Sequence, residues 1–179
     1  IIPTNLVKGV SDALIEALKK VKIGNPEDIE TQMGSIVSEN QKQEILAITS
    51  KFSQENKLIF KGIEPKKGAF VSPHLYHSTN ALKGGIVHNI EAFGPVATMM
   101  NYDNLSQASK LIKLGGGSLV SSIFTFDSHF ANNMVAEIAA WNGRIYINNR
   151  ESAGEATGHG SPLPHLTHGG PGRAGGGEE

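Results

Sequence analysis

The chain has 179 residues, with 16 Lys and Arg against 17 Asp and Glu, and therefore a formal net charge of −1. This balance argues against a nucleic-acid partner or a polybasic membrane anchor, because phosphate binding needs a surplus of cations on some face. Hydrophobic residues make up 39% and cysteine is absent, which predicts a folded domain with one core and excludes disulfides, thiolate metal sites and a cysteine nucleophile within these residues.

Both ends of the sequence look like cut ends. Ile1-Ile2-Pro3 lacks an initiating methionine and is typical of a strand, and the chain closes within a glycine run. We therefore expect a fragment of a longer protein. No apolar run approaches the length of a membrane span and no signal-peptide pattern opens the chain, so we expect no membrane partner and a cytoplasmic protein.

Two amphipathic helices are predicted in the first third of the chain. Apolar residues at spacings of three and four run from Leu6 to Val21, and Thr4 can cap the first turn. Ser38 and Gln41 fit a capping box, in which each side chain satisfies a backbone group of the other's turn, before a helix that runs to about Glu55. Both helices indicate packing rather than function.

Strands and helices then alternate along the chain. Two short strands are expected at 58–60 and 69–76, followed beyond a Gly- and His-rich loop by strand 96–102, helix 105–113, strand 118–126, helix 130–141 and strand 144–149. Short connections between such elements are typical of βαβ units with parallel strands and right-handed crossovers. The sequence predicts an α/β fold whose ligands lie beyond the carboxyl ends of the strands, at 102–103, 126–127 and 148–149.

The last 28 residues differ in composition, with 9 of the 21 glycines, 3 of the 8 prolines and 3 of the 7 histidines. We divide the chain into an α/β part, 1–155, and a Gly-, His- and Pro-rich loop, 156–179, which we expect to be mobile. Its histidines, His159, His165 and His168, invite a zinc hypothesis. Because two prolines prevent a regular helix and no acidic ligand stands at a recognisable spacing, we predict no metal site there.

A carboxylate and an aromatic ring flank a turn into the strand at 96–102. Glu91 can accept hydrogen bonds from two vicinal hydroxyls, as a ribose presents, and Phe93 offers a flat face for a planar ring. Gly94-Pro95 turns the chain between them and the strand. From these residues alone, an exposed acid beside a core phenylalanine is the simpler interpretation.

Five short segments occur in an order that is specific as a set: 22–26 (KIGNP), 31–34 (TQMG), 91–96 (EAFGPV), 143–148 (GRIYIN) and 161–162 (SP). In this order they resemble the aldehyde dehydrogenase superfamily over essentially the whole chain. The closing stretch from residue 149 to the end is similar, more narrowly, to the aldehyde dehydrogenase part of bifunctional phenylacetic acid degradation proteins (PaaZ type), which also carry an enoyl-CoA hydratase-like domain. The resemblance implies a truncated catalytic domain of this type, with a twisted parallel sheet and helices on both faces.

The resemblance also implies a reaction. A cysteine attacks the aldehyde, hydride passes to NADP or NAD, and a glutamate activates the water that releases the acid. That cysteine, the glutamate and the Rossmann domain would all precede Ile1, so the chain by itself would hold no catalytic residue and be inactive. The implied substrate is a small-molecule aldehyde, a CoA-linked semialdehyde, and the implied full-length protein is a homo-oligomer.

Cofactor and substrate residues follow from the same resemblance. Glu91 falls on the residue that holds the nicotinamide ribose, and Phe93 on the aromatic beside the nicotinamide. The loop that shapes the aldehyde pocket corresponds to Asn148, Asn149, Glu151, Ala153 and Leu163. No metal ligand is implied.

Two alternatives stay open at this point. The scaffold of an aldehyde dehydrogenase could serve a non-catalytic binding or assembly module, and a cysteine segment encoded just upstream would exclude that reading. A metal-dependent hydrolase built on the histidine-rich tail is the other alternative, and metal analysis of the purified protein would decide it.

Overall fold

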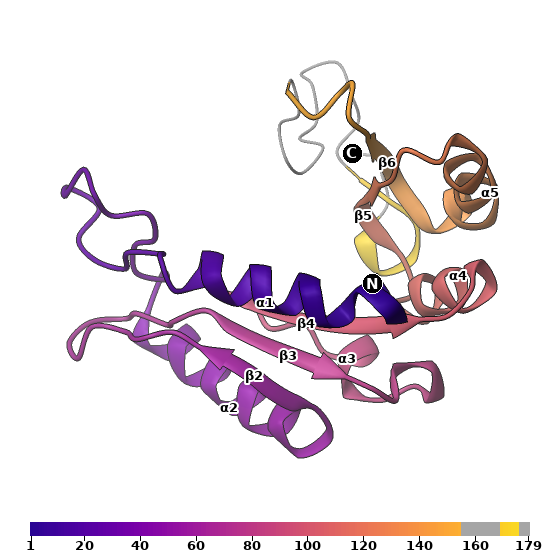
Figure 1. Ribbon diagram of the computed structural model, residues 1–179. Helices are drawn as coiled ribbons and strands as arrows, with labels where there is room; N and C mark the ends of the chain where they lie inside the picture. The colour runs from indigo at the N-terminus through magenta and orange to yellow at the C-terminus, as the bar shows by residue number, and fades with distance from the viewer. Residues whose placement is uncertain (155–168, 176–179) are drawn as a thin grey trace. The chain divides into compact units, whose positions relative to one another are not determined.

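The computed structural model describes residues 1–154 and 169–175, and the chain forms two compact units (Figure 1). The first unit comprises residues 1–103 and the second residues 104–179. This division falls between the expected strand at 96–102 and the expected helix at 105–113. The separate, mobile loop expected at 156–179 lies mostly outside the described residues and stays a prediction.

A four-stranded sheet is the framework of the first unit. Its order is β1 (Ile2–Pro3), β4 (Val96–Tyr102), β3 (His74–Ser78) and β2 (Lys57–Lys61). β4 runs parallel to β1 and to β3, whereas β2 is antiparallel to β3. The connection from β2 to β3 contains no helix, so this pair lacks the crossover that parallel strands use.

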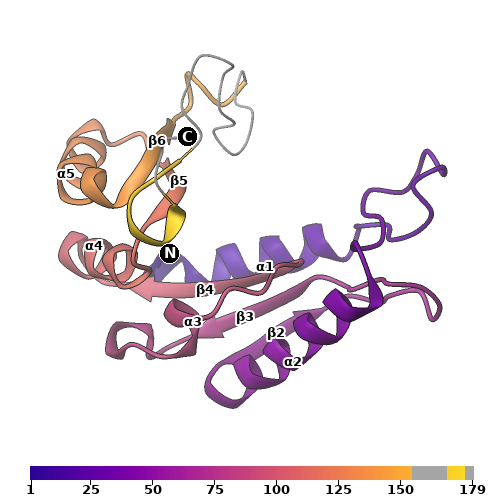
Figure 2. The ribbon, with the colours of Figure 1, turned by 180° about the vertical axis from the view of Figure 1, so that it is seen from behind.

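Helices lie on both faces of this sheet, as the resemblance implied (Figure 1, Figure 2). α1 (Val7–Leu18), which η1 (Thr4–Leu6) precedes, covers one face and α2 (Glu39–Glu55) the other; η2 (Ala81–Lys83) and α3 (Ile86–Asn89) connect β3 to β4. The ring of Phe52 meets the ring of Tyr76 edge-on, with centroids 5.7 Å apart. The Tyr76 hydroxyl donates to the Thr49 carbonyl at 2.9 Å, so α2 is joined to β3 by both apolar and polar contacts.

The two predicted helix caps have different outcomes. Ser38 caps α2, because its hydroxyl accepts from the Gln41 backbone N–H at 3.2 Å. Thr4 is not a cap: its hydroxyl donates to the Tyr102 carbonyl at 3.1 Å, since the β1–β4 pairing brings that carbonyl within reach. The Gln41 side chain does not return to the cap either, so the capping box is only half formed.

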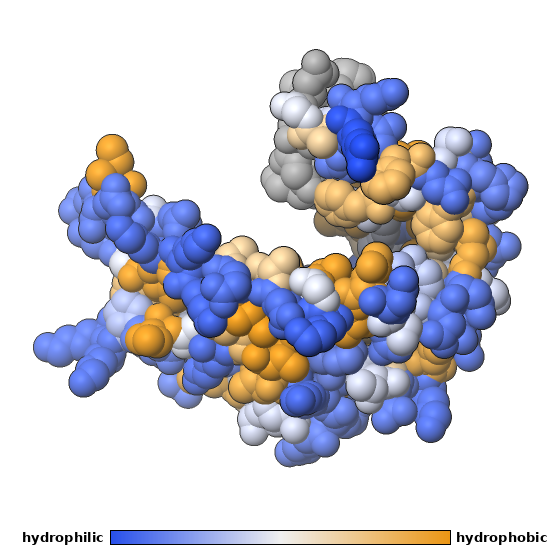
Figure 3. All heavy atoms as spheres, in the orientation of Figure 1, coloured by the Kyte–Doolittle hydropathy of each residue, from blue (hydrophilic) through white to orange (hydrophobic). Residues whose placement is uncertain are grey.

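α1 buries less than its periodic pattern suggests. None of its residues is fully buried, and Leu14 is 37% exposed. In the view of Figure 3, hydrophilic residues dominate the outer side of this helix and hydrophobic ones show between them. No helix in the described part of the chain is both long and apolar enough to cross a membrane.

The second unit contains a βαβ motif, as the alternating pattern predicted. α4 (Leu105–Leu114) is followed by β5 (Ser118–Phe124), α5 (Ser128–Ile138), η3 (Ala139–Trp141) and β6 (Asn142–Asn148). β5 and β6 run parallel, with Ser118 opposite Asn142 and Phe124 opposite Asn148. The buried apolar side chains of α4 and α5 form its core: Ala108, Leu111, Ala131, Met134 and Ile138.

Residues 169–175, which include η4 (Gly172–Ala174), lie close against the starts of β5 and β6. The Arg173 N–H donates to the Gly116 carbonyl at 3.0 Å. A Cβ atom on Gly143 would overlap the Gly169 carbonyl, and one on Gly117, whose φ is +119°, would overlap the Pro171 carbonyl. Backbone meets backbone at both points, so only glycine fits there.

Candidate functional site

The loop that carries Glu91 and Phe93 lies between α3 and β4 in the first unit. Its backbone turns through short local bonds, from Gly94 N–H to the Ala92 carbonyl and from Val96 N–H to the Gly94 carbonyl, both at 2.7 Å. Glu91 is exposed and Phe93 is 73% exposed. Phe93 is therefore no core residue, which corrects the simpler interpretation of this segment, and both side chains are open to a ligand.

α2 holds this loop in place through two contacts. The Gln41 side-chain amide donates to the Phe93 carbonyl at 3.0 Å. One turn later, the buried Ile45 lies under Gly94, where an added Cβ would stand 2.6 Å from the Ile45 Cδ1 atom. Neither role is visible in the sequence, because a glutamine at the third helical position is typical of a capping residue and an isoleucine of an ordinary core residue.

Two histidines of the first unit, His88 and His74, are buried. His88 of α3 is 6% exposed, and its Nε2 lies 2.8 Å from the Ala81 carbonyl. His74 opens β3 at 4% exposure, with Nδ1 2.7 Å from the Ser72 carbonyl, and burial lowers its pKa. Each ring meets a backbone carbonyl, which lets it remain inside.

The residues expected to shape the aldehyde pocket begin where β6 ends, in the second unit. The Asn148 carbonyl accepts from Thr125 N–H at 3.0 Å, which ties β6 to the segment after β5. The Asn149 Oδ1 atom accepts from the N–H groups of Glu151 and Ser152, each at 2.9 Å, and forms an Asx turn. This turn leaves the Glu151 and Ala153 side chains exposed. Leu163 lies outside the described residues.

Two exposed aromatic side chains and an arginine lie at the same strand ends. Phe124 and Phe126 are 70% and 78% exposed, and the Arg150 guanidinium carbon lies 5.0 Å from the centre of the Phe126 ring. The carboxyl ends of β5 and β6 thus present apolar and cationic surface together. The sequence named the 126–127 position as a strand end but did not single out Arg150.

The predicted site residues fall into the two units. Glu91 and Phe93 belong to the first unit, whereas Asn148, Asn149, Glu151 and Ala153 belong to the second. That the two groups border one active site stays a prediction.

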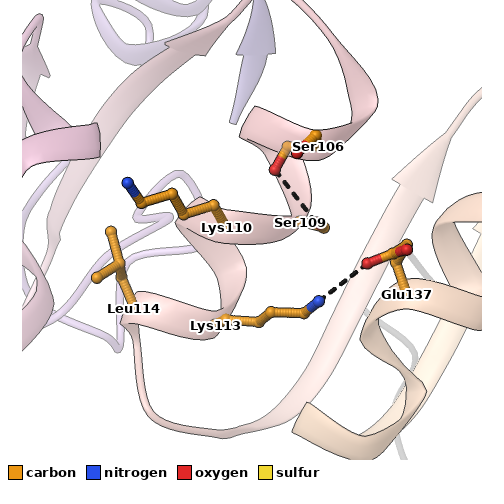
Figure 4. Close-up of a pocket in the computed structure, with 6 residues that line it drawn as sticks. All are labelled: Ser106, Ser109, Lys110, Lys113, Leu114 and Glu137. Atoms are coloured by element: carbon orange, nitrogen blue, oxygen red, sulfur yellow. Dashed lines mark hydrogen bonds and ion pairs between the residues drawn. The ribbon is translucent and has the colours of Figure 1, made fainter.

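A surface hollow of about 350 Å³ lies between α4 and α5 in the second unit (Figure 4). The Lys113 ammonium and the Glu137 carboxylate meet across it at 2.9 Å, and this hydrogen-bonded charge lowers the pKa of Glu137. None of the sequence-predicted site residues lines it. We assign the pair to helix packing.

No three acidic or histidine side chains in residues 1–154 and 169–175 come together in a way that could hold a metal ion. The histidines of the zinc hypothesis, His159, His165 and His168, lie outside those ranges. The absence of a metal site in the tail therefore stays a prediction.

The sequence of the chain matches a known protein family and several individual proteins. A profile described as the aldehyde dehydrogenase family matches residues 1–175. Protein MaoC of Klebsiella aerogenes is 43% identical over 156 residues, which cover 82% of this chain and 45% of that protein. The 3,4-dehydroadipyl-CoA semialdehyde dehydrogenase of Aromatoleum evansii is 33% identical over 177 residues, which cover 94% of this chain and 34% of that protein. The chain thus spans less than half the length of these curated relatives.

Solved structures show the same fold. The NAD+ complex of betaine aldehyde dehydrogenase from Staphylococcus aureus matches with a TM-score of 0.78 at 21% identity, over 97% of this chain and 33% of that one. Proline utilization A of Bradyrhizobium japonicum matches with a TM-score of 0.82 at 24% identity, over 97% of this chain and 17% of that one. With a family match over nearly its whole length and relatives above 30% identity, the chain belongs to the aldehyde dehydrogenase family.

Proposed function

We propose that the whole protein is an NADP- or NAD-dependent aldehyde dehydrogenase that oxidises a CoA-linked semialdehyde in phenylacetate degradation. This chain would supply one wall of the active site. Family membership supports the aldehyde dehydrogenase part. The relative named as a CoA-semialdehyde dehydrogenase supports the substrate class, and the betaine aldehyde dehydrogenase complex with NAD+ supports a nicotinamide cofactor.

The main support for the proposal is the exposed ring of Phe93, a residue whose backbone carbonyl is held by a hydrogen bond. Phenylalanine side chains are usually buried when a protein folds. The Phe93 side chain is 73% exposed, although its backbone carbonyl accepts a hydrogen bond from Gln41. A ring held in this way can pack against a planar ligand without first becoming ordered. The exposed Glu91, two residues away, can accept from the two hydroxyls of a ribose.

The chain's own residues would therefore bind and orient rather than react. When bound, the nicotinamide supplies the hydride acceptor. Glu91 would fix its ribose, Phe93 would limit the positions of its ring, and the Asn149 turn would shape the substrate side. The 179 residues contain no cysteine, so the nucleophile would come from elsewhere in the whole protein and the chain alone would be inactive.

The test uses the whole enzyme encoded around this chain. Phe93→Ala and Glu91→Gln should each raise the KM for the cofactor by about tenfold, roughly 1.4 kcal/mol, with a smaller change in the KM for aldehyde. Ile63→Ala is the control, because Ile63 is also an apolar loop residue and is 93% exposed. Equal cofactor KM values in all variants would contradict the assignment.

Substrate class and inactivity have separate tests. The whole enzyme should oxidise 3,4-dehydroadipyl-CoA semialdehyde with a higher kcat/KM than the matching aldehyde without CoA. The chain alone, mixed with cofactor and aldehyde, should form no reduced cofactor at its absorbance band. Turnover that follows this chain through purification would refute the need for a nucleophile from outside it.

A further inference from the structure

Two aromatic rings and one guanidinium group lie where β5 and β6 end in the second unit. We call Phe124, Phe126 and Arg150 the strand-end patch. Phe124 closes β5 opposite Asn148, the last residue of β6, and Arg150 follows two residues later in the chain. Both rings are mostly exposed. The patch therefore adjoins the Asn149 turn and is open to a ligand.

The charge of Arg150 is not neutralised within the described part of the chain. Its guanidinium carbon lies 5.0 Å from the centre of the Phe126 ring, and no carboxylate of the described residues forms an ion pair with it. The Asp127 carboxylate caps α5 instead, and the Glu151 side chain is exposed in the turn. A guanidinium that rests on a ring keeps N–H donors at its edge, so Arg150 can still bind an anion.

The strand-end patch combines apolar surface with a positive charge. Exposed aromatic rings favour contact with methylene groups or with another apolar surface, whereas the arginine fork binds carboxylate or phosphate oxygens through two N–H groups. A single molecule that meets both demands has an apolar middle and an anionic end. Because the patch adjoins the turn that would shape the aldehyde side, the other end of such a molecule is the aldehyde.

We propose that Arg150 selects aldehydes whose far end is anionic, and that Phe124 and Phe126 contact the apolar chain between the two ends. This inference rests on the proposed function for the oxidation of an aldehyde, and it adds the residue that sets substrate preference. A carboxylate and the phosphates of CoA supply the same chemistry, and the substrates of the test separate them. Arg150 binds and positions the substrate and takes no part in the chemical step.

Kinetics of the whole enzyme encoded around this chain test the preference with three substrates: adipic semialdehyde, its CoA thioester and its neutral N-acetylcysteamine thioester. Arg150→Gln should lower kcat/KM about tenfold for at least one anionic substrate, the effect of losing one charge-assisted pair, and should leave the neutral thioester unchanged. The substrate that loses rate identifies carboxylate or phosphate as the anion. Arg150→Lys keeps the charge without the fork and should recover part of the preference.

Lys110→Gln is the matched control, because it removes an exposed positive charge from α4 of the same unit and Lys110 forms no ion pair among the described residues. It should leave all three kcat/KM values unchanged. A second measurement needs no variant. Raising KCl toward 1 M, where screening acts over about 3 Å, should reduce the preference of the parent enzyme for the anionic substrate.

Calorimetry with adipate and adipyl-CoA, which carry no aldehyde, measures anion binding without turnover. If no aldehyde is oxidised while one of these ligands binds more weakly to Arg150→Gln than to the parent, the proposed function fails and the anion site stands. Equal losses of kcat/KM for the neutral and anionic substrates in Arg150→Gln would show a structural role and overturn the inference. Kinetics and binding that do not change in Arg150→Gln, or the absence of both turnover and binding, would overturn it as well.

Discussion

The side-chain amide of Gln41 donates to the Phe93 carbonyl at 3.0 Å, across 52 residues of sequence. This bond joins the first turn of α2 to the loop in front of β4, and Ile45 lies under the same loop at Gly94. The backbone of the loop is thereby held while the Phe93 ring stays exposed. A fixed backbone with a free aromatic face suits the binding of a flat ligand.

Replacing Gln41 by Ala should free this loop. The loss of one partly exposed hydrogen bond should lower the free energy of unfolding by about 0.5–1.5 kcal/mol in urea titration. In the whole enzyme the KM for the cofactor should rise about fivefold, the equivalent of about 1 kcal/mol. Gln43→Ala is the control, since the Gln43 side chain is exposed on the same helix and makes no hydrogen bond among the described residues. Matching KM values for the two variants would rule out a positioning role for Gln41.

Gly94→Ala should destabilise the first unit because the new methyl group would meet Ile45 Cδ1 at 2.6 Å. Overpacking of this kind lowers the free energy of unfolding by about 1–3 kcal/mol. Ile45→Val removes the Cδ1 atom, so the double variant should recover part of that loss. Gly9→Ala is the comparison, because Gly9 has open space around its Cβ position within α1. A double variant that is less stable than the sum of the single changes would exclude this packing.

Gly143→Ala should destabilise the second unit more than Gly94→Ala destabilises the first. The obstacle at Gly143 is the backbone carbonyl of Gly169, which cannot rotate away as a side chain can. We expect a loss of about 3 kcal/mol, the upper end for overpacking, measured by denaturant unfolding. Gly154→Ala has no heavy atom within 4 Å of its Cβ position and should change stability little. Equal losses in the free energy of unfolding for Gly143→Ala and Gly154→Ala would mean that residues 169–175 do not pack on β6.

Lowering the pH should reduce the stability of the first unit, because His74 takes up a proton less readily in the folded chain than in the unfolded one. Burial lowers the pKa of His74 below its ordinary value of 6.5, against a smaller opposing effect of the Ser72 carbonyl. The unfolded chain then binds a proton near pH 6.5 while the folded one stays neutral, so the His74 contribution to stability is complete above that pH and is lost as the pH falls toward the folded pKa. Tm should fall between about pH 7.5 and 5.5, and His74→Gln should flatten this slope. Parallel pH profiles for the two proteins would exclude His74 as the cause.

Local sequence patterns by themselves determined most of the helices and strands. The three-and-four spacing from Leu6 and the Ser38 cap predicted α1 and α2, and the alternation after residue 96 predicted β4, α4, β5, α5 and β6. These features depend on neighbours within one or two turns, which a sequence shows directly. Five short segments in a fixed order also indicated the family, which the comparisons confirmed.

Tertiary structure alone decided which groups meet across the chain. The Gln41 side chain had two possible partners, the Ser38 backbone N–H of its own helix cap and a distant carbonyl, and only the packing of α2 against the loop selected the Phe93 carbonyl. Gly143 was named only as part of the segment 143–148, and the structure alone shows that its backbone lies against the Gly169 carbonyl. Contacts between residues tens of positions apart leave no periodic trace, because they depend on how whole elements pack rather than on the order of side chains within one of them.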